Sequence, residues 1–199
     1  MSPRSQKVSD DDIFAAAYRV MNRVAPSDMT LGAIAEEAGV TAGLLVQRFG
    51  SKRALMVRLA ALSAGASRGM IEQLRAANDS ALATLDAYVQ CMAGLASSPE
   101  ALVRSLAYLT DDLSDPELRT HLETQGKYTR VALEALVREA IDAGELVTST
   151  DAKALVRTIE AIIPGSMITW ATYRTGTAAR WMRREVAAVV DPYRVASSK

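Results

Sequence analysis

The side chains best suited to bind another molecule lie between residues 30 and 52, in the stretch TLGAIAEEAGVTAGLLVQRFGSK. Thr30 and Thr41 are good helix N-caps, and Gly39 between them is typical of a left-handed helix stop. The stretch therefore predicts two short helices joined by a tight turn, which is the layout of a helix-turn-helix. In that motif the second helix enters the major groove of DNA, so the expected chemistry is recognition of bases and phosphates.

The second of these helices offers small and polar side chains on the face that would meet DNA. The residues at its start are small enough to let the helix approach base edges closely. Gln47 can form a bidentate contact with adenine or contact a phosphate. Leu44, Leu45 and Phe49 are expected to point inward. The exposed amides at the starts of both helices suit phosphate oxygens. The residues predicted to contact DNA are Thr41, Ala42, Gly43 and Gln47, flanked by Thr30, Arg48 and Lys52.

Helical spacing of apolar residues extends over the whole chain, and strand signals are almost absent. A first helix is expected to begin near Asp10 or Asp11 and to end at Pro26. The sequence predicts an all-α chain of about nine helices, with a helix-turn-helix DNA-binding domain at 1–52 and a larger helical domain at 53–199. Beyond the helix-turn-helix, helices are expected at about 52–76, 79–96, 99–113, 116–143, 151–174 and 177–190.

The charge of the chain is balanced, with 23 Lys+Arg against 23 Asp+Glu. Any DNA contact must therefore come from a few placed cations and not from a broadly basic surface. No stretch reaches the roughly 20 apolar residues of a membrane span, and no apolar signal segment follows Arg4 and Lys7. The protein is expected to be soluble and cytoplasmic.

The sequence contains little that suggests catalysis or metal binding. The sole histidine, His121, has no motif-borne nucleophile nearby, and no glycine-rich phosphate loop is present. Asp111 and Asp112 would point about 100° apart on a helix, so they are expected to be solvated charges. Cys91 is expected to be a small buried apolar residue. We therefore expect no catalytic residue, no metal site and no cofactor.

The N-terminal motif resembles the tetracycline-repressor-type (TetR) family. The resemblance rests on I-x-x-AA from Ile13, on TLGAIAEEAGVTAGLLVQRFGSKRAL, and on the helical remainder of the chain. It implies a homodimer, an all-helical ligand-binding domain and a recognition helix at 41–49. The family usually has an aromatic residue, often Tyr, at Val46, and frequently a His at Arg48. Val46 could instead touch a thymine methyl, and Arg48 could replace the lost phosphate contact.

A ligand pocket is predicted around the helix expected at 116–143. Gln125 and Thr129 interrupt an apolar row on this helix, and polar groups in an apolar face need a partner in protein, water or ligand. The alternative that stays open places Gln125 at a helix edge in water and the neighbouring large side chains in an ordinary core. The candidate ligand-binding residues are Tyr88, Met92, Gln125, Tyr128 and Trp170.

The last two helices offer more apolar surface than one small domain needs, which predicts a homodimer through helices near 151–190. The residues of this predicted face are Ile159, Ile162, Ile163, Met167, Trp170, Trp181, Met182, Val186 and Val190. Together these features favour a sequence-specific DNA-binding regulator, a repressor released from operator DNA by an unidentified small-molecule effector. Two other classes stay open: a helical protein–protein adaptor, and a small-molecule enzyme in which the helix pair is only structural.

Overall fold

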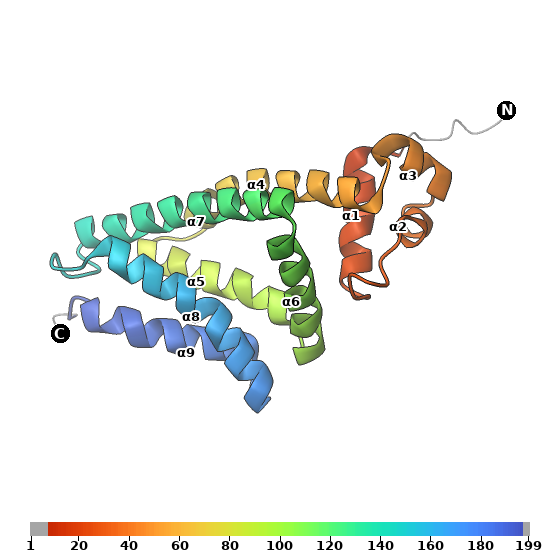
Figure 1. Ribbon diagram of the computed structural model, residues 1–199. Coiled ribbons are helices and arrows are strands. Elements are labelled where there is room, and N and C mark those ends of the chain that lie inside the picture. The colour runs from red at the N-terminus through yellow and green to blue at the C-terminus, as the bar shows by residue number, and fades with distance from the viewer. Residues whose placement is uncertain (1–7, 197–199) are drawn as a thin grey trace. The chain divides into compact units, whose positions relative to one another are not determined.

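The computed structural model describes residues 8–196, which form nine α-helices and two short 3-10 helices (Figure 1). Within this range the only β-type pairing is an isolated bridge between Leu146 and Arg194. The predicted all-α class with about nine helices is confirmed. None of the helices in the described range is long and apolar enough to cross a membrane.

The chain divides into two compact units. The first contains the described residues up to Leu62 together with Arg104–His121, and the second contains Ser63–Val103 and the residues from Leu122 onward. Three helices contribute residues to both units: α4 (Lys52–Ala76), α6 (Pro99–Ser114) and α7 (Pro116–Asp142). The division into functional domains after residue 52 stays a prediction.

The first unit is built around three N-terminal helices, α1 (Asp10–Met21), α2 (Leu31–Glu37) and α3 (Ala42–Phe49). α2 packs against both α1 and α3. The apolar stripe of α1 lies in a core that also receives residues from α4 and α6. Its buried members are Ile13, Phe14, Ala16, Ala17, Val20, Met29, Ile34, Ala35, Leu45, Phe49, Leu55, Leu59 and Tyr108.

The ends of α1 differ from the prediction. Ser9, and not an aspartate, is the N-cap, because its hydroxyl accepts from the Asp12 amide while the Asp12 carboxylate accepts from the Ser9 amide. This reciprocal pair is a capping box. The helix ends at Met21, where Asn22 is the C-cap, so the chain leaves the helix before Pro26. The predicted end at Pro26 was wrong because a turn of non-helical residues precedes the proline.

The second unit contains the remaining parts of α4, α6 and α7 together with α5 (Ala81–Ala93), α8 (Ala152–Tyr173) and α9 (Ala178–Val190). α9 packs against α8 and α5, and α8 continues through Pro164 and bends along its length (Figure 1). The Glu145 carboxylate accepts from the Ala81 and Leu82 amides, both at 3.1 Å, and so caps the start of α5 with a negative charge. Short 3-10 helices follow α5 (Gly94–Ala96) and α9 (Asp191–Tyr193).

The apolar residues of α8 and α9 are mostly used within the chain itself. Seven of the nine predicted for the homodimer face are buried in the second unit, and only Ile162 and Trp181 stay partly exposed. The expected apolar excess was wrong because the two helices bury these side chains against each other and against α5. The buried seven are Ile159, Ile163, Met167, Trp170, Met182, Val186 and Val190.

Candidate nucleic-acid interface

Two capped helices and a short turn fix the position of α3. The Thr30 hydroxyl accepts from the Ala33 amide at 3.1 Å, and the Thr41 hydroxyl accepts from the Leu44 amide at 3.2 Å, which confirms both predicted N-caps. Gly39 between the helices has φ +68°, a conformation that side-chain-bearing residues rarely adopt. The sequence therefore specifies both helix starts and the turn between them.

One face of α3 is held in the core and the other is exposed. Leu45 and Phe49 are buried, with 0% and 6% of their surface accessible. Leu44, which we expected to point inward, is 37% exposed, because it lies one residue off the buried stripe on a helix with 3.6 residues per turn. The residues exposed on the outer face include Thr41, Ala42, Gly43, Val46 and Gln47.

This outer face combines small residues with one long amide side chain. Val46 is 52% exposed and Gln47 is exposed beside it, so both can contact another molecule without rearrangement of the helix. The Thr30 and Thr41 hydroxyl oxygens already accept backbone hydrogen bonds, but each hydroxyl still has a hydrogen to donate. The face can therefore approach a groove closely and donate to phosphate oxygens at its edges.

The two flanking cations have partners within the first unit. Arg48 Nη1 donates to the Val8 carbonyl at 2.7 Å, and its Nε lies 2.7 Å from an Asp10 carboxylate oxygen. Lys52 Nζ donates to the Pro26 carbonyl at 2.9 Å. In this arrangement Arg48 holds the chain before α1, and Lys52 holds the segment between α1 and α2.

Ion pairs also tie α1 and the segment that follows it to α2. Arg19 Nε lies 2.6 Å from a Glu37 carboxylate oxygen, and Arg23 donates to the other oxygen of the same carboxylate. Hydrogen bonds from Arg23 and then Arg19 lower the pKa of Glu37 below its ordinary value, so this glutamate stays ionised. Arg58 lies over the Phe49 ring at 5.3 Å and adds a cation–π contact to the core-facing side of α3.

Comparison with known families assigns both parts of the chain. Residues 13–59 match the model of bacterial regulatory proteins of the tetR family, and residues 71–186 match that of the tetracyclin repressor-like C-terminal domain. The chain belongs to the TetR family. It is therefore a DNA-binding transcriptional regulator, and the predicted resemblance is confirmed.

Solved structures share the fold of this TetR-family chain at low sequence identity. A TetR transcription regulator from Haloarcula marismortui is 18% identical, with TM-score 0.77, over 94% of this chain and 98% of that one. NemR of E. coli in its reduced form is 16% identical, with TM-score 0.74, over 96% and 99%. FadR of Bacillus subtilis in complex with stearoyl-CoA is 20% identical, with TM-score 0.68, over 92% and 98%. No protein with a curated function matches the sequence.

The ligand-binding candidates of this TetR-family chain lie in different surroundings within the second unit. Tyr88 is 6% exposed, and burial, followed by the charges of Glu160 and Cys91, raises its pKa to about 12. Trp170 is also buried, and its indole N–H donates to the Gly176 carbonyl at 3.2 Å. Both side chains are buried in the second unit, and their role in ligand binding stays a prediction.

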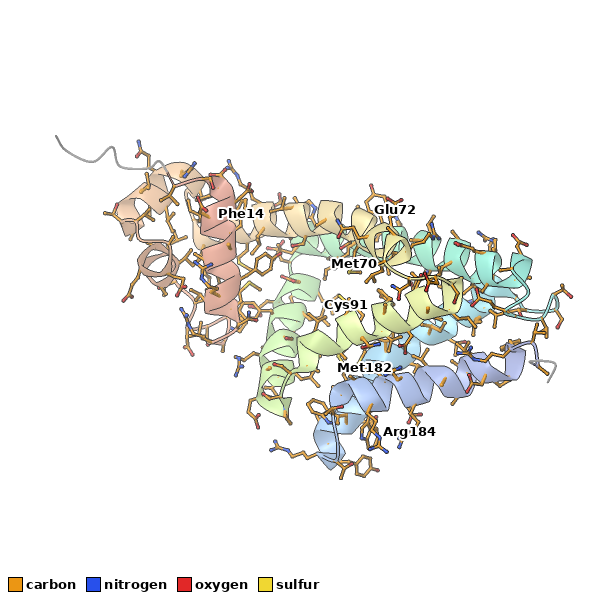
Figure 2. The ribbon with its side chains drawn as sticks, turned by 180° about the vertical axis from the view of Figure 1, so that it is seen from behind. Phe14, Met70, Glu72, Cys91, Met182 and Arg184 are labelled. Carbon is orange, nitrogen blue, oxygen red and sulfur yellow. The ribbon has the colours of Figure 1, made fainter. Side chains whose placement is uncertain are left out.

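The other three candidates are only partly buried. Met92, Gln125 and Tyr128 have intermediate exposure, and they do not line the pockets described below. Nearby, Cys91 is exposed, and its Sγ lies 3.9 Å from the Met70 sulfur between α4 and α5 (Figure 2). The expected burial of Cys91 was wrong, because the residue lies on the edge of α5 and not on its buried face.

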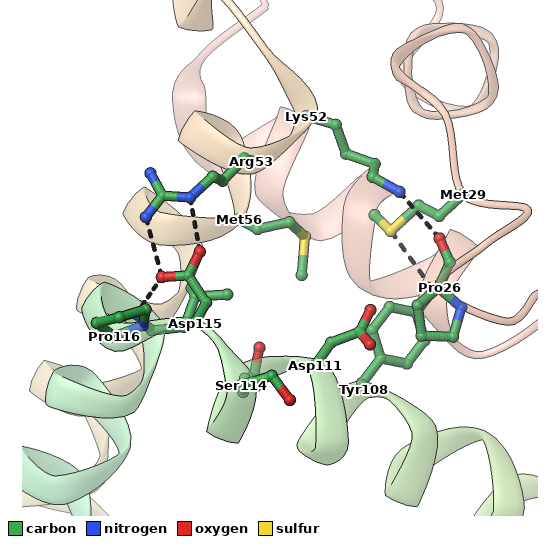
Figure 3. Close-up of a pocket in the computed structure, with 12 residues that line it drawn as sticks. Pro26, Met29, Lys52, Arg53, Met56, Tyr108, Asp111, Ser114, Asp115 and Pro116 are labelled. Atoms are coloured by element: carbon green, nitrogen blue, oxygen red, sulfur yellow. Dashed lines mark hydrogen bonds and ion pairs between the residues drawn. The ribbon is translucent and has the colours of Figure 1, made fainter.

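The first unit contains a pocket of about 420 Å³ that no local sequence pattern predicted (Figure 3). Its walls come from the segment after α1, from the start of α4, and from the junction of α6 and α7. A volume of this size is within the usual range for small-molecule sites. The lining residues are Pro26, Met29, Lys52, Arg53, Met56, Tyr108, Asp111, Asp112, Ser114, Asp115, Pro116 and Leu118.

Proposed function

We propose that this TetR-family chain is a repressor that binds operator DNA as a homodimer and leaves it when a small molecule binds. The observation that carries the proposal is the exposed face of α3, which has small residues at its start and the polar side chain of Gln47 further along. The N-caps of α2 and α3 fix the position of this helix. A helix presented in this way fits the major groove. As a regulator of transcription, the protein acts in the cytoplasm together with the DNA.

The proposed contacts divide into base readout and phosphate binding. Gln47 reads a base edge, and Val46 contacts a thymine methyl in place of the phosphate contact that a tyrosine would make. The Thr30 and Thr41 hydroxyls and the helix N-termini bind phosphates, with Ala42 and Gly43 allowing the close approach. Arg48 and Lys52 bind phosphates at the margin, and Lys52 must first release the Pro26 carbonyl.

Operator binding can be tested without knowing the operator in advance. We would select bound sequences from random double-stranded DNA and measure affinity by fluorescence anisotropy at several salt concentrations. We expect Gln47→Ala to change the base preference at one position of each half-site. Lys52→Ala should weaken binding to all sequences and lower the salt slope by about 1.

Gln73→Ala is the matched control, because Gln73 is also an exposed glutamine in a helix but lies in the second unit. It should leave affinity and base preference unchanged. If no sequence is enriched by the wild-type protein, the repressor proposal fails. If Gln47→Ala and Lys52→Ala both behave like Gln73→Ala, the proposed contact face is wrong.

We propose that the homodimer forms through the remaining exposed surface of α8 and α9. A hollow of about 460 Å³ lies there, lined by Ala161, Ile162, Gly165, Ser166, Thr169, Trp181, Arg184 and Glu185. The small residues on α8 would allow a second helix to approach closely. Trp181 makes two contacts at the edge of this surface. Its ring stacks on that of Tyr173 with the ring centroids 5.8 Å apart, and its indole N–H donates to the Thr175 carbonyl at 2.6 Å.

Release by a small molecule is the third part of the proposal. A structural neighbour, FadR of Bacillus subtilis, was solved in complex with stearoyl-CoA, which supports small-molecule binding by a chain of this fold. A ligand can release DNA only if it binds the DNA-free state more tightly than the DNA-bound state. The effector must therefore contact a part of the protein that differs between the two states.

A further inference from the structure

Hydrogen bonds anchor two sides of the pocket in the first unit. At one side Arg53 Nε and Nη2 donate to the two carboxylate oxygens of Asp115, at 2.6 and 2.9 Å. At the other side the Tyr108 hydroxyl donates to the Val24 carbonyl at 3.1 Å, and Tyr108 is itself part of the core. Figure 3 shows the Arg53–Asp115 pair and the Tyr108 side chain on opposite sides of the open space. Both anchors therefore lie within one compact unit.

Part of the pocket wall, formed by Met29, Met56 and Tyr108, is apolar and polarizable. Met29 and Tyr108 are almost fully buried, and Met56 extends from α4 toward the same space as Asp111 and Ser114 from α6 (Figure 3). Methionine side chains adapt to irregular ligands, and an aromatic ring attracts a cation. These walls suit a ligand with an apolar body.

The charges that line the pocket do not balance. Asp111, Asp112 and Asp115 face two cations, Lys52 and Arg53. Arg53 pairs with Asp115, and the Lys52 ammonium donates to a backbone carbonyl. Among the side chains that the structure describes, Asp111 and Asp112 have no ion-pair partner. The pocket thus has an excess of one negative charge, located at its α6 wall.

Asp112 is the carboxylate most in need of a counter-charge. Its partial burial, followed by the negative charges of Asp111 and Asp115, raises its pKa above the ordinary value. A ligand that brings a positive charge to this wall would replace the hydration that Asp112 has lost. A neutral or anionic ligand would leave the charge uncompensated or worsen it.

The geometry favours an organic cation over a metal ion. In the part of the chain that the structure describes, no three His, Cys, Asp or Glu side chains converge on a point where a metal could be held. Hard metal ions need six or more oxygen ligands, which methionine, proline and tyrosine ring atoms cannot supply. An ammonium or phosphonium ion with an apolar body needs only one or two carboxylates and apolar walls.

We propose that this pocket binds a monovalent organic cation, with its charge at Asp111 and Asp112 and its apolar body against Met29, Met56 and Tyr108. The further step, that this cation is the effector, rests on the proposed function. Lys52 and Pro26 form one rim of the pocket, and the hydrogen bond between them is the one that Lys52 must break to reach a phosphate. A ligand packed against the intact rim therefore selects the DNA-free arrangement.

Two probes of the same size and shape test the charge requirement. Tetraphenylphosphonium is the cation, and tetraphenylborate is the matched anion. In equilibrium dialysis with the full chain at pH 7, we expect tetraphenylphosphonium to occupy one site per chain, and tetraphenylborate to bind at least tenfold more weakly. Equal binding of the two ions would show that the pocket selects apolar surface only, and would overturn the proposal.

Asp112→Asn tests the position of the site. This variant removes a charge that the folded protein disfavours, so it should fold at least as well as the wild type. We expect it to weaken tetraphenylphosphonium binding roughly tenfold, the size of one charge-assisted contact. Asp79→Asn, at an exposed aspartate in the second unit, is the control and should bind like the wild type. Equal affinities for the wild type and Asp112→Asn would place the cation elsewhere and overturn the proposal.

The effector step has a separate readout. With a selected operator, tetraphenylphosphonium should release DNA from the wild type at concentrations that release little from Asp112→Asn. If the wild type binds no operator, the proposed function fails while the dialysis result still decides the cation site. If the operator binds but saturating cation leaves its affinity unchanged, the pocket is a cation site and the effector step is overturned.

Discussion

Asp115 shows how one side chain can fix a corner of the fold. It lies between α6 and α7, where its carboxylate accepts from the Glu117 amide at 2.9 Å and from the Leu118 amide at 3.3 Å. The same carboxylate pairs with Arg53 at the start of α4. The hydrogen bond from Arg53, helped by the two amides, lowers the pKa of Asp115 to about 2.

The ionised Asp115 should stabilise the fold in a pH-dependent way. Because its folded pKa is below the ordinary 3.8, its contribution is fully present above that value and is lost as the pH falls through about 2. We expect Asp115→Asn, which keeps a capping oxygen but loses the charge, to lower the melting temperature at pH 7. The difference between variant and wild type should shrink as the pH falls from about 4 toward 2. Thermal unfolding followed by circular dichroism at a series of pH values would measure it, and a difference independent of pH would contradict the assignment.

At the scale of single residues, the sequence predicts local features better than distant partners. Thr30 and Thr41 could be recognised as N-caps because a cap bonds an amide three residues away. The Val8 partner of Arg48 and the Pro26 partner of Lys52 lie 40 and 26 residues away, and no local pattern indicates such pairs. For this reason the sequence indicates the proposed DNA-contacting residues, but not the hydrogen bonds that Arg48 and Lys52 already make within the chain.

α4 contains two glycines whose role can be tested at the scale of the element. A methyl group added at Gly65 or Gly69 would meet no atom within 4 Å, apart from the helix's own nearby backbone, so neither glycine is needed for a close contact in this structure. Glycine in a helix interior costs about 1 kcal/mol relative to alanine. These two residues therefore make α4 less stable than its length allows.

We expect Gly65→Ala to raise the free energy of unfolding by up to ~1 kcal/mol in urea titrations, because it adds helix propensity without a clash. Gly39→Ala is the contrasting variant. Gly39 also has open space around it, but its φ of +68° strains any side chain. Gly39→Ala should therefore lower the free energy of unfolding by roughly 1 kcal/mol. A loss of stability in Gly65→Ala would show that the glycine serves a contact absent from this structure.

At the scale of helices, prolines and glycines in the sequence predict where individual helices begin and end. The helix predicted at 116–143 is observed as Pro116–Asp142, because a proline fixes its start and a left-handed glycine, Gly144, follows its end. The apolar row of α8 was assigned to a dimer because periodicity shows that a face is covered, not what covers it. In the structure α9 covers much of that row.

At the scale of the whole molecule, the sequence could predict the class of fold but not its cavities. The pocket at Asp112 gathers residues from 26–29, 52–56 and 108–118, which meet only after the unit has folded. The adjacent aspartates 111 and 112 were the only local signal, and solvated charge was the simpler interpretation. A pocket formed by three distant segments requires the tertiary structure.

Assembly into a dimer decides whether the proposed repressor can function. One helix-turn-helix reads few base pairs, whereas two copies on a twofold axis read half-sites about 34–36 Å apart or a multiple of it. The proposed face on α8 and α9 includes the exposed Gly165. A Cβ atom added at Gly165 would meet no atom of its own chain within 4 Å, apart from the helix's own nearby backbone. Substitution at this position can therefore block a partner helix without disturbing the protomer.

We expect Gly165→Glu to convert a wild-type dimer into a folded monomer at micromolar concentration, because a close helix contact would bury a bulky, unpaired charge. Gly126→Glu is the control, since Gly126 is also an exposed helical glycine with open space but lies on α7, outside the hollow. Sedimentation velocity would measure assembly, and circular dichroism would confirm equal helix content. Without the second half-site contact, operator affinity should fall about 100-fold or more in Gly165→Glu alone. A wild type that sediments as a monomer would refute the homodimer, whereas a dimeric Gly165→Glu would move the interface to another surface.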